Sequence, residues 1–313
     1  MSLSVQFLGT AASRPTLERN VASLALVREG ETMLVDCGEG TQRQMMKYGI
    51  SFNFGDVLIT HWHADHYLGL MGLCRTLVLQ DRTVPLRLWA PKGAERMIKK
   101  MDGLGLERLS FPLEVRELGP GDEIKRDGYV IRTFPLDHRG APSFGYALVE
   151  EERRGRFNPD LAREFGIPEG PQWGQLHKGE AITLADGRVI APEMLVGPTR
   201  TGRTVVVTGD TRPTEATIEA ARGADLLVHE ATFAEEEATR AVETGHSTAR
   251  EAATVAAAAG VKRLVLTHLS ARYTRDTTDL DREARAVFPA TLIARDGMEI
   301  VVEFGDDVAV APG

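Results

Sequence analysis

The sequence predicts a large α/β protein from its length and from two recurring patterns. The chain has 313 residues, 42% hydrophobic and 26% charged, the balance of a globular protein that can bury a sizeable core. This length is common among α/β and two-sheet folds. Short apolar runs typical of strands recur in both halves, bounded by glycine and polar turns. Segments with apolar residues at helical spacing lie between them.

The individual elements follow from these patterns. We expect strands at the runs Ser4–Leu8, Ala22–Leu26, Met33–Cys37, Val57–Thr60, Leu86–Ala90, Val130–Phe134, Val205–Thr208, Leu226–His229 and Leu264–Thr267. We expect helices at Tyr67–Leu79, near Pro213–Arg222 and near Thr248–Ala259. Thr248 and Glu251 have the spacing of a capping box, and Gly260 fits the end of that helix.

Residues 150–203 differ in composition from the rest of the chain. They are rich in glycine, proline and charge, as in GIPEGPQWGQ and VGPTRTGR. Long connections of this kind are uncommon inside a compact core and are often functional. We therefore expect one domain over residues 1–313 with an inserted, flexible arm at 150–203.

Charge and cysteine content limit the class of protein. The net charge is −8, whereas nucleic-acid binders are usually basic, so any RNA contact requires a local basic patch or metal ions. The two cysteines, Cys37 and Cys74, argue against a disulfide scaffold and fit a reducing cytoplasm. We expect both in the core. Neither a signal-peptide pattern nor a run of 18 apolar residues is found, so we expect no membrane segment.

The segment HWHADH holds the densest group of metal-ligand residue types. His61, His63, Asp65 and His66 follow an apolar run and precede a predicted helix, and alternate residues of an extended stretch point to one side. Imidazoles and carboxylates at a loop are the donors of a borderline-soft divalent cation. His138, Asp210 and His268 each follow another strand-like run. These are more ligands than one ion uses. Asp36 fits a turn, a supporting contact or a direct ligand equally well.

The order of these residues resembles the dinuclear zinc signature of the metallo-β-lactamase superfamily. The resemblance implies a four-layer αββα sandwich and two Zn2+ per subunit. Other stretches resemble ribonuclease Z within that superfamily: the opening FLGTAASRPTLERNVASL, then DHRGAPSFGY, HEAT at 229–232, HST at 246–248 and THLSARY. The insertion with GIPEGPQWGQL resembles the exosite arm with which that family grips the body of tRNA.

The resemblance also implies an activity and a division of roles. The activity is removal of the 3′ trailer from precursor tRNA, leaving a 3′-hydroxyl on the tRNA and a 5′-phosphate on the trailer, by a cytoplasmic homodimer with no membrane or DNA partner. One zinc would be bound by His61, His63, His138 and the bridging Asp210, and the other by Asp65, His66, Asp210 and His268. Expected substrate contacts are Arg19, Asn20, Thr232, Ser247, Thr248 and Arg272, with Arg153, Arg154, Arg156 and Lys178 in the arm.

Three side chains have proposed catalytic roles. Asp65 is expected to orient or deprotonate the attacking water, and His246 to protonate the leaving ribose oxygen. His246 precedes a helix N-terminus, which disfavours its charged form, so a carboxylate such as Glu230 is needed beside it. The alternative for His246 is a hydrogen bond in the helix cap. For Arg272, surface solvation is the alternative to holding a phosphate.

Two other classes of function remain open at this point. Another hydrolase of the same fold, such as a broad phosphodiesterase or a 3′ exoribonuclease, would share the metal site without needing the arm. A non-catalytic RNA-binding protein with a relic site is the second alternative, and the intact ligand set argues against it.

Overall fold

The computed structural model describes residues 2–106 and 108–305, and the chain divides into two compact units. One unit comprises Met1–Val149 and Arg203–Gly313, and the other comprises Glu150–Gly202. No helix in the described part of the chain is both long and apolar enough to cross a membrane.

The larger unit contains a first sheet of seven strands in the order β16-β1-β2-β3-β4-β5-β6. Its strands are β1 (Leu3–Gly9), β2 (Ser23–Arg28), β3 (Glu31–Val35), β4 (Asp56–Leu58), β5 (Leu86–Pro91), β6 (Leu113–Leu118) and β16 (Glu299–Val301). The pairs from β3 to β6 are parallel, so the ends of β3 and β4 meet at one edge of the sheet. Asp36 follows β3 at that edge, and the HWHADH segment follows β4.

The second sheet also has seven strands, in the order β15-β14-β13-β12-β9-β8-β7. Its strands are β7 (Glu123–Arg126), β8 (Tyr129–Pro135), β9 (Phe144–Glu150), β12 (Thr204–Val207), β13 (Leu226–Glu230), β14 (Leu264–Thr267) and β15 (Thr291–Ile293). The strands β12 to β15 are parallel. Asp210, the HEAT segment and His268 therefore emerge at the same edge of this sheet.

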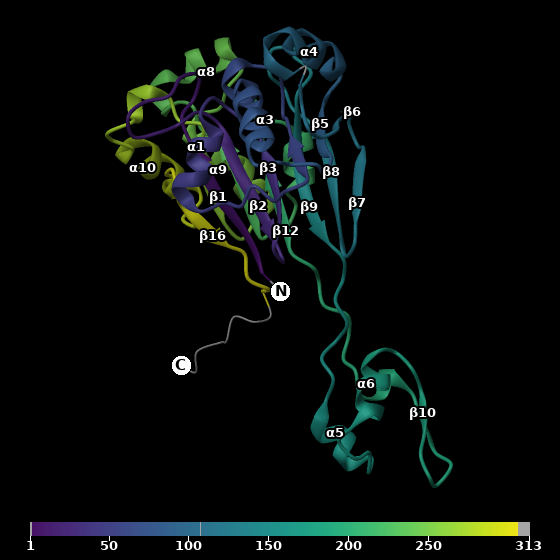
Figure 1. Cartoon of the computed structure of the whole chain (residues 1–313). Coiled ribbons are helices and arrows are strands. Elements are labelled where there is room, and N and C mark those ends of the chain that lie inside the picture. The colour runs from purple at the N-terminus through teal and green to yellow at the C-terminus, as the bar shows by residue number, and fades with distance from the viewer. Residues whose placement is uncertain (1, 107, 306–313) are drawn as a thin grey trace. The chain divides into compact units, whose positions relative to one another are not determined.

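The two sheets pack face to face, with helices on both outer faces (Figure 1). Phe7, Met33, Tyr146 and Val205 are among the side chains buried between the sheets. The first sheet is covered by α1 (Thr41–Tyr48), α3 (Gly69–Leu79) and α4 (Ala94–Met101), and the second by α7 (Glu215–Ala220), α9 (Ala249–Ala259) and α10 (Thr278–Val287). This is the four-layer αββα sandwich that the family resemblance implies.

Most expected elements are present, with some changes at their ends. The helix expected at Tyr67–Leu79 is divided into a short α2 (Ala64–Tyr67) and α3. A β-carbon at Gly69 would lie 2.0 Å from the carbonyl oxygen of Gly38, so glycine permits close approach of the two backbones. The capping box at Thr248 is confirmed, and Gly260 ends α9 with a φ of 64°. Helices α1, α4, α8 (Ala238–Thr244) and α10 were not predicted, nor were the short turns η1 (Asp102–Leu106), η3 (Glu235–Glu237) and η4 (Ala271–Tyr273).

The smaller unit has secondary structure and a core of its own. It contains α5 (Pro159–Glu164), α6 (Pro171–His177), the strand pair β10 (Ile182–Thr183) and β11 (Val189–Ile190), and the turn η2 (Pro192–Met194). The side chain of Asn158 caps α5 by accepting a hydrogen bond from the backbone N–H of Leu161. Its buried apolar side chains are Ala162, Ile167, Leu176, Ile182, Ile190 and Leu195. The sequence composition alone gave no indication of this core.

Candidate metal centre

The ligand residues expected from the sequence converge where the two sheets end. His61, His66, His138, Asp210 and His268 are buried, Asp65 is half-buried, and His63 is exposed. His61, His63, His138 and Asp210 form one group of potential ligands, and Asp65, His66 and His268 form a second. In each group the candidate ligand atoms all lie within 4.8 Å of one another. The residues that the sequence pattern singled out as metal ligands therefore lie close together in the fold.

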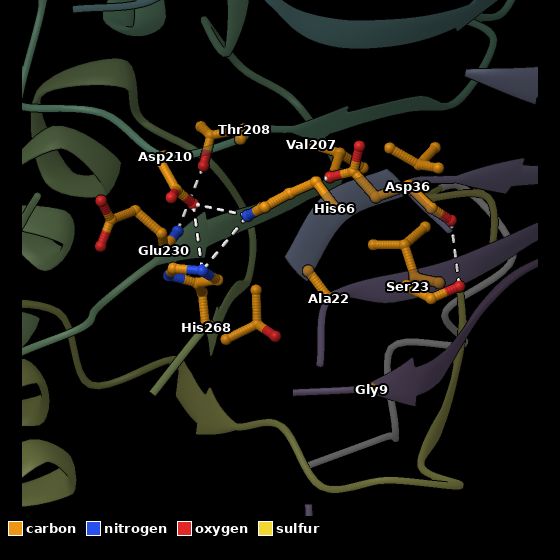
Figure 2. Close-up of a pocket in the computed structure, with 14 residues that line it drawn as sticks. Gly9, Ala22, Ser23, Asp36, His66, Val207, Thr208, Asp210, Glu230 and His268 are labelled. Carbon is orange, nitrogen blue, oxygen red and sulfur yellow. Dashed lines mark hydrogen bonds and ion pairs between the residues drawn. The ribbon is translucent and has the colours of Figure 1, made fainter. Parts of the chain in front are cut away.

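Asp210 lies between the two groups, and its oxygens face different histidines. Its Oδ1 is 3.3 Å from Nε2 of His66 and 3.3 Å from Nε2 of His268. Its Oδ2 is 3.6 Å from Nε2 of His61 and 3.9 Å from Nε2 of His138. Figure 2 shows Asp210, His66 and His268 directed toward one another. Asp210 thus connects the two groups of potential ligands.

The distances and unsatisfied atoms fit bound metal. Two donors at 2.0–2.1 Å from a tetrahedral zinc are roughly 3.3 Å apart, close to the spacings around Asp210. Nε2 of His61 and Oδ1 of Asp210 are buried and have no hydrogen-bond partner among the described residues. A buried polar atom left in this state costs roughly 1–3 kcal/mol, and a cation coordinated by these atoms would remove that cost.

Hydrogen bonds fix the orientation of the ligand histidines. Nδ1 of His66 lies 2.7 Å from Oδ2 of Asp36, and Nδ1 of His138 lies 2.8 Å from the carbonyl oxygen of Gly245. Nδ1 of His268 lies 3.0 Å from Oγ1 of Thr232. In each ring the occupied Nδ1 leaves Nε2 directed at the centre, as is usual for metal-binding histidines. Asp36, whose role the sequence left open, thus supports His66.

The electrostatics of the centre favour a cation. Burial and the neighbouring His66 lower the pKa of His61 well below its ordinary value, so His61 is neutral and offers its lone pair. Burial opposes the charge of Asp65, but the hydrogen bond from His268 and the charge of His66 outweigh it and lower the pKa of Asp65. Burial likewise opposes a charge on His66, yet Asp210 and Asp36 raise its pKa well above the ordinary value. Asp210 and Asp36 thus attract positive charge to His66.

His246 and Glu230 form a pair beside the centre. Nδ1 of His246 lies 2.9 Å from Oε1 of Glu230, and the ring centroid of His246 is 5.5 Å from that of His268. Glu230 is buried and also accepts hydrogen bonds from the backbone N–H groups of Thr211 and Thr232. Burial lowers the pKa of His246, but the charge and hydrogen bond of Glu230 outweigh this and raise it to about 9. Nε2 of His246 makes no hydrogen bond to the residues that the structure describes.

Four residues expected to contact substrate make hydrogen bonds inside the protein. Arg19 is buried, and its Nη1 donates to Oγ1 of Thr10 and to the carbonyl oxygen of Ala294, both at 2.7 Å. The other three are Thr232, which contacts Glu230 and His268, Ser247, which donates to the carbonyl oxygen of Thr211, and Thr248, which caps α9. These contacts fix the four side chains in a buried polar network, and their contact with substrate stays a prediction.

Asn20 and Arg272, the other two expected substrate contacts, also have partners within the protein. Nδ2 of Asn20 donates to the carbonyl oxygen of Glu39, and its backbone N–H donates to Asp296. Arg272 is partly exposed and forms an ion pair with Glu237. Substrate contacts by these two residues remain predictions.

The sequence analysis did not foresee the contact of Ser13 with a ligand residue. The backbone N–H of Ser13 donates to Oδ2 of Asp65 at 2.7 Å, which holds that carboxylate toward the centre. Ser13 has a φ of 61°, which is uncommon for a residue other than glycine. Its position in the family-like opening SRPTLERN was the only signal available.

Comparisons with known proteins agree with this geometry. A family model described as a beta-lactamase superfamily domain matches residues 194–269, and one described as anti-Pycsar protein Apyc1 matches residues 3–154. The ribonuclease Z of Gemmatimonas aurantiaca is 62% identical over 313 residues, covering 100% of both chains. That of Myxococcus xanthus is 49% identical, covering 97% of this chain and 99% of the relative.

A solved structure supports the same assignment. The crystal structure of human tRNase Z, short form, matches with a TM-score of 0.70 and 29% identity, covering 96% of this chain and 99% of the human chain. The resemblance seen in the sequence motifs is therefore confirmed. With its fold, its His/Asp centre and full-length relatives at this identity, the chain belongs to the ribonuclease Z family of metal-dependent, metallo-β-lactamase-fold endoribonucleases.

Proposed function

We propose that this protein cleaves precursor tRNA just after the discriminator base, using two Zn2+ per subunit. The products are tRNA ending in a 3′-hydroxyl and a trailer beginning with a 5′-phosphate. The observation that carries the proposal is Asp210, whose two oxygens face two separate histidine groups. A donor set of imidazoles and carboxylates favours zinc over hard cations such as Mg2+.

The proposed ligands divide into two sets that share Asp210. His61, His63 and His138 complete one set, and Asp65, His66 and His268 complete the other. When bound, a pair of divalent cations would supply Lewis-acid stabilisation of the phosphodiester and a more acidic water.

In this proposal Asp65 orients the attacking water. Its Oδ2 is anchored by the N–H of Ser13 and lies 3.3 Å from Nε2 of His268, so the carboxylate is held at the edge of the centre. Its lowered pKa keeps it ionised but makes it a weak base, so it accepts a hydrogen bond from the water, whose proton passes to solvent. As water attacks phosphorus, the new P–O bond forms on the side opposite the ribose oxygen that leaves.

His246 is placed to protonate that leaving oxygen. Its Nδ1 is occupied by Glu230, which leaves Nε2 as the proton-donating nitrogen. The proton passes from Nε2 to the ribose O3′ as the P–O3′ bond breaks, which generates the 3′-hydroxyl of the tRNA. Glu230 stabilises the protonated ring before transfer and fixes its orientation.

Residues 150–202 are the proposed gripping arm for the body of tRNA. Their own small core supports a defined surface, and Lys178 is exposed on it. Six buried apolar side chains pack together and give this short segment a core that supports its surface. Shape-based contacts to the RNA backbone suit this role better than base reading.

We further propose a cytoplasmic homodimer. The dimer is what the family resemblance implies. Cys37 and Cys74 are buried free thiols, which suits a reducing compartment. Light scattering at several protein concentrations tests the dimer.

The test of the function is the position of the cut. A precursor tRNA labelled at its 5′ end is incubated with the zinc-loaded protein, and the labelled product is sized to one nucleotide. One product ending at the discriminator base, and no ladder, is the expected result. Progressive shortening would favour a 3′ exoribonuclease, and an intact precursor would favour a relic RNA-binding protein.

A further inference from the structure

Arg212 contacts both the HST segment, which carries the proposed proton donor His246, and the start of α9. Its guanidinium donates to the backbone carbonyl oxygen of His246 and forms an ion pair with Glu251 at the start of α9. The contact of Nη1 with Oε2 of Glu251 is 2.9 Å, and Nη2 bonds the other carboxylate oxygen. This two-point geometry is specific to arginine and fixes the plane of the guanidinium.

The backbone beside Arg212 is tied to the same surroundings. The N–H of Arg212 donates to the carbonyl oxygen of Asp137 at 2.8 Å, next to the ligand His138. The carbonyl oxygen of Thr211 accepts from Oγ of Ser247 at 2.6 Å. The segment that supplies Asp210 is thereby joined to both the His138 loop and the HST segment.

The HST segment connects α8 to α9, and its end is held by a β-bridge between Thr248 and Phe233. Gly245 ends α8 in a left-handed conformation, with a φ of 75°. His246 is then held by its backbone N–H, its ring Nδ1 and its carbonyl oxygen, which contact Ala241, Glu230 and Arg212 respectively. Removing the Arg212 contact takes the guanidinium anchor from the carbonyl oxygen of His246, and positioning errors of about 1 Å cost roughly 10²-fold in rate.

We propose that Arg212 is a positioning residue that sets the direction of His246 Nε2 toward the leaving oxygen. This inference rests on the proposed role of His246 as proton donor. Arg212 itself does not touch the reacting atoms. Arg212 forms an ion pair with Glu251, which also completes the capping box of α9. The carboxylate of Glu251 therefore contacts both the start of α9 and the arginine that holds the HST segment.

The role of Arg212 predicts a selective defect. Cleavage of RNA expels a ribose alkoxide, which requires a proton as the P–O3′ bond breaks. Hydrolysis of bis(p-nitrophenyl) phosphate expels p-nitrophenolate, which leaves as a stable anion without a proton. A misdirected His246 therefore slows RNA cleavage and spares the activated ester, whereas damage to the metal ligands slows both.

The experiment compares kcat for precursor tRNA and for bis(p-nitrophenyl) phosphate in zinc-loaded variants. Arg212→Lys keeps the charge and loses the two-point contact. Glu251→Gln keeps a side chain suited to the capping box and loses the ion pair. Arg222→Lys is the matched control, because it alters an exposed Arg–Glu pair on the neighbouring helix end. His246→Ala reports the donor itself, and thermal unfolding checks the fold of each variant.

We expect His246→Ala to lose about 10²–10⁴-fold on RNA. We expect Arg212→Lys to lose about 10–100-fold in kcat on RNA with little change in KM. Its loss in kcat on the activated ester should be at least about ten-fold smaller than its loss on RNA. Glu251→Gln should show the same selectivity with a smaller loss. Equal losses on both substrates, or no loss, in Arg212→Lys overturn the Arg212 assignment alone. Undiminished RNA cleavage by His246→Ala overturns the donor role as well.

Discussion

The metal centre and residues 150–202 are stabilised by different means. At the centre, buried histidines and carboxylates are each fixed by further polar contacts, as His66 is by Asp36 and His246 is by Glu230. In residues 150–202, a core of six apolar side chains supports a largely exposed, charged surface. The first construction suits chemistry, which requires fixed groups of unusual charge. The second suits recognition of a large substrate, and the two should respond differently to mutation.

The largest expected effect is at Asp210, because both ligand groups depend on it. Asp210→Ala should lower cleavage of precursor tRNA and of bis(p-nitrophenyl) phosphate alike, by about 10⁴-fold or more. Steady-state rates on the two substrates check this, with Asp186→Asn in the smaller unit as the control. Retained activity on either substrate would show that the centre does not require a shared carboxylate.

The next largest effect is expected at Glu230. Glu230→Gln removes the charge that favours protonated His246, and we expect a loss of about 10³-fold in kcat on precursor tRNA with little change in KM. Single-turnover cleavage measures it. A rise in KM alone would place Glu230 in substrate binding rather than in proton transfer.

Removal of the smaller unit separates the two regions most directly. A variant that replaces Glu151–Leu195 with a short glycine–serine linker should lose about 10²-fold in kcat/KM on precursor tRNA, because backbone contacts are lost. Hydrolysis of bis(p-nitrophenyl) phosphate should be maintained, since none of the ligand residues lies in this unit. Equal tRNA cleavage with and without these residues would favour a general phosphodiesterase.

A smaller effect is expected at Asp36, which orients one ligand. Asp36→Asn keeps the size of the side chain and removes its charge, so zinc affinity should fall about 10-fold. Competition with a chromogenic chelator measures the affinity, and Asp56→Asn, at a buried carboxylate on β4 that pairs with Arg87, is the matched control. An unchanged zinc affinity would assign Asp36 to the fold alone.

The sequence revealed the parts of the site that depend on local patterns. His61, His63, Asp65 and His66 are close in the chain, and His268 directly follows a strand, so spacing alone made them ligand candidates. The fold class also followed, because strand and helix periods are local properties. Parallel strands then brought the separate ligands to one edge of each sheet.

Roles that depend on pairing between distant residues were not visible. The sequence did not show that the guanidinium of Arg19 reaches the carbonyl oxygen of Ala294, 275 positions away in the chain. Nor did it show that Thr232 contacts His268. Asp36 was ambiguous until its contact with His66 was known. Side-chain burial is set by tertiary packing, and a single sequence does not specify which polar residue meets which partner.

The metal content of the purified protein tests the central claim most directly. Elemental analysis after dialysis against metal-free buffer should find about two zinc ions per wild-type chain, and less than one in Asp210→Ala, because a shared carboxylate holds both ions. A single ion per wild-type chain that persists unchanged in Asp210→Ala would contradict the account.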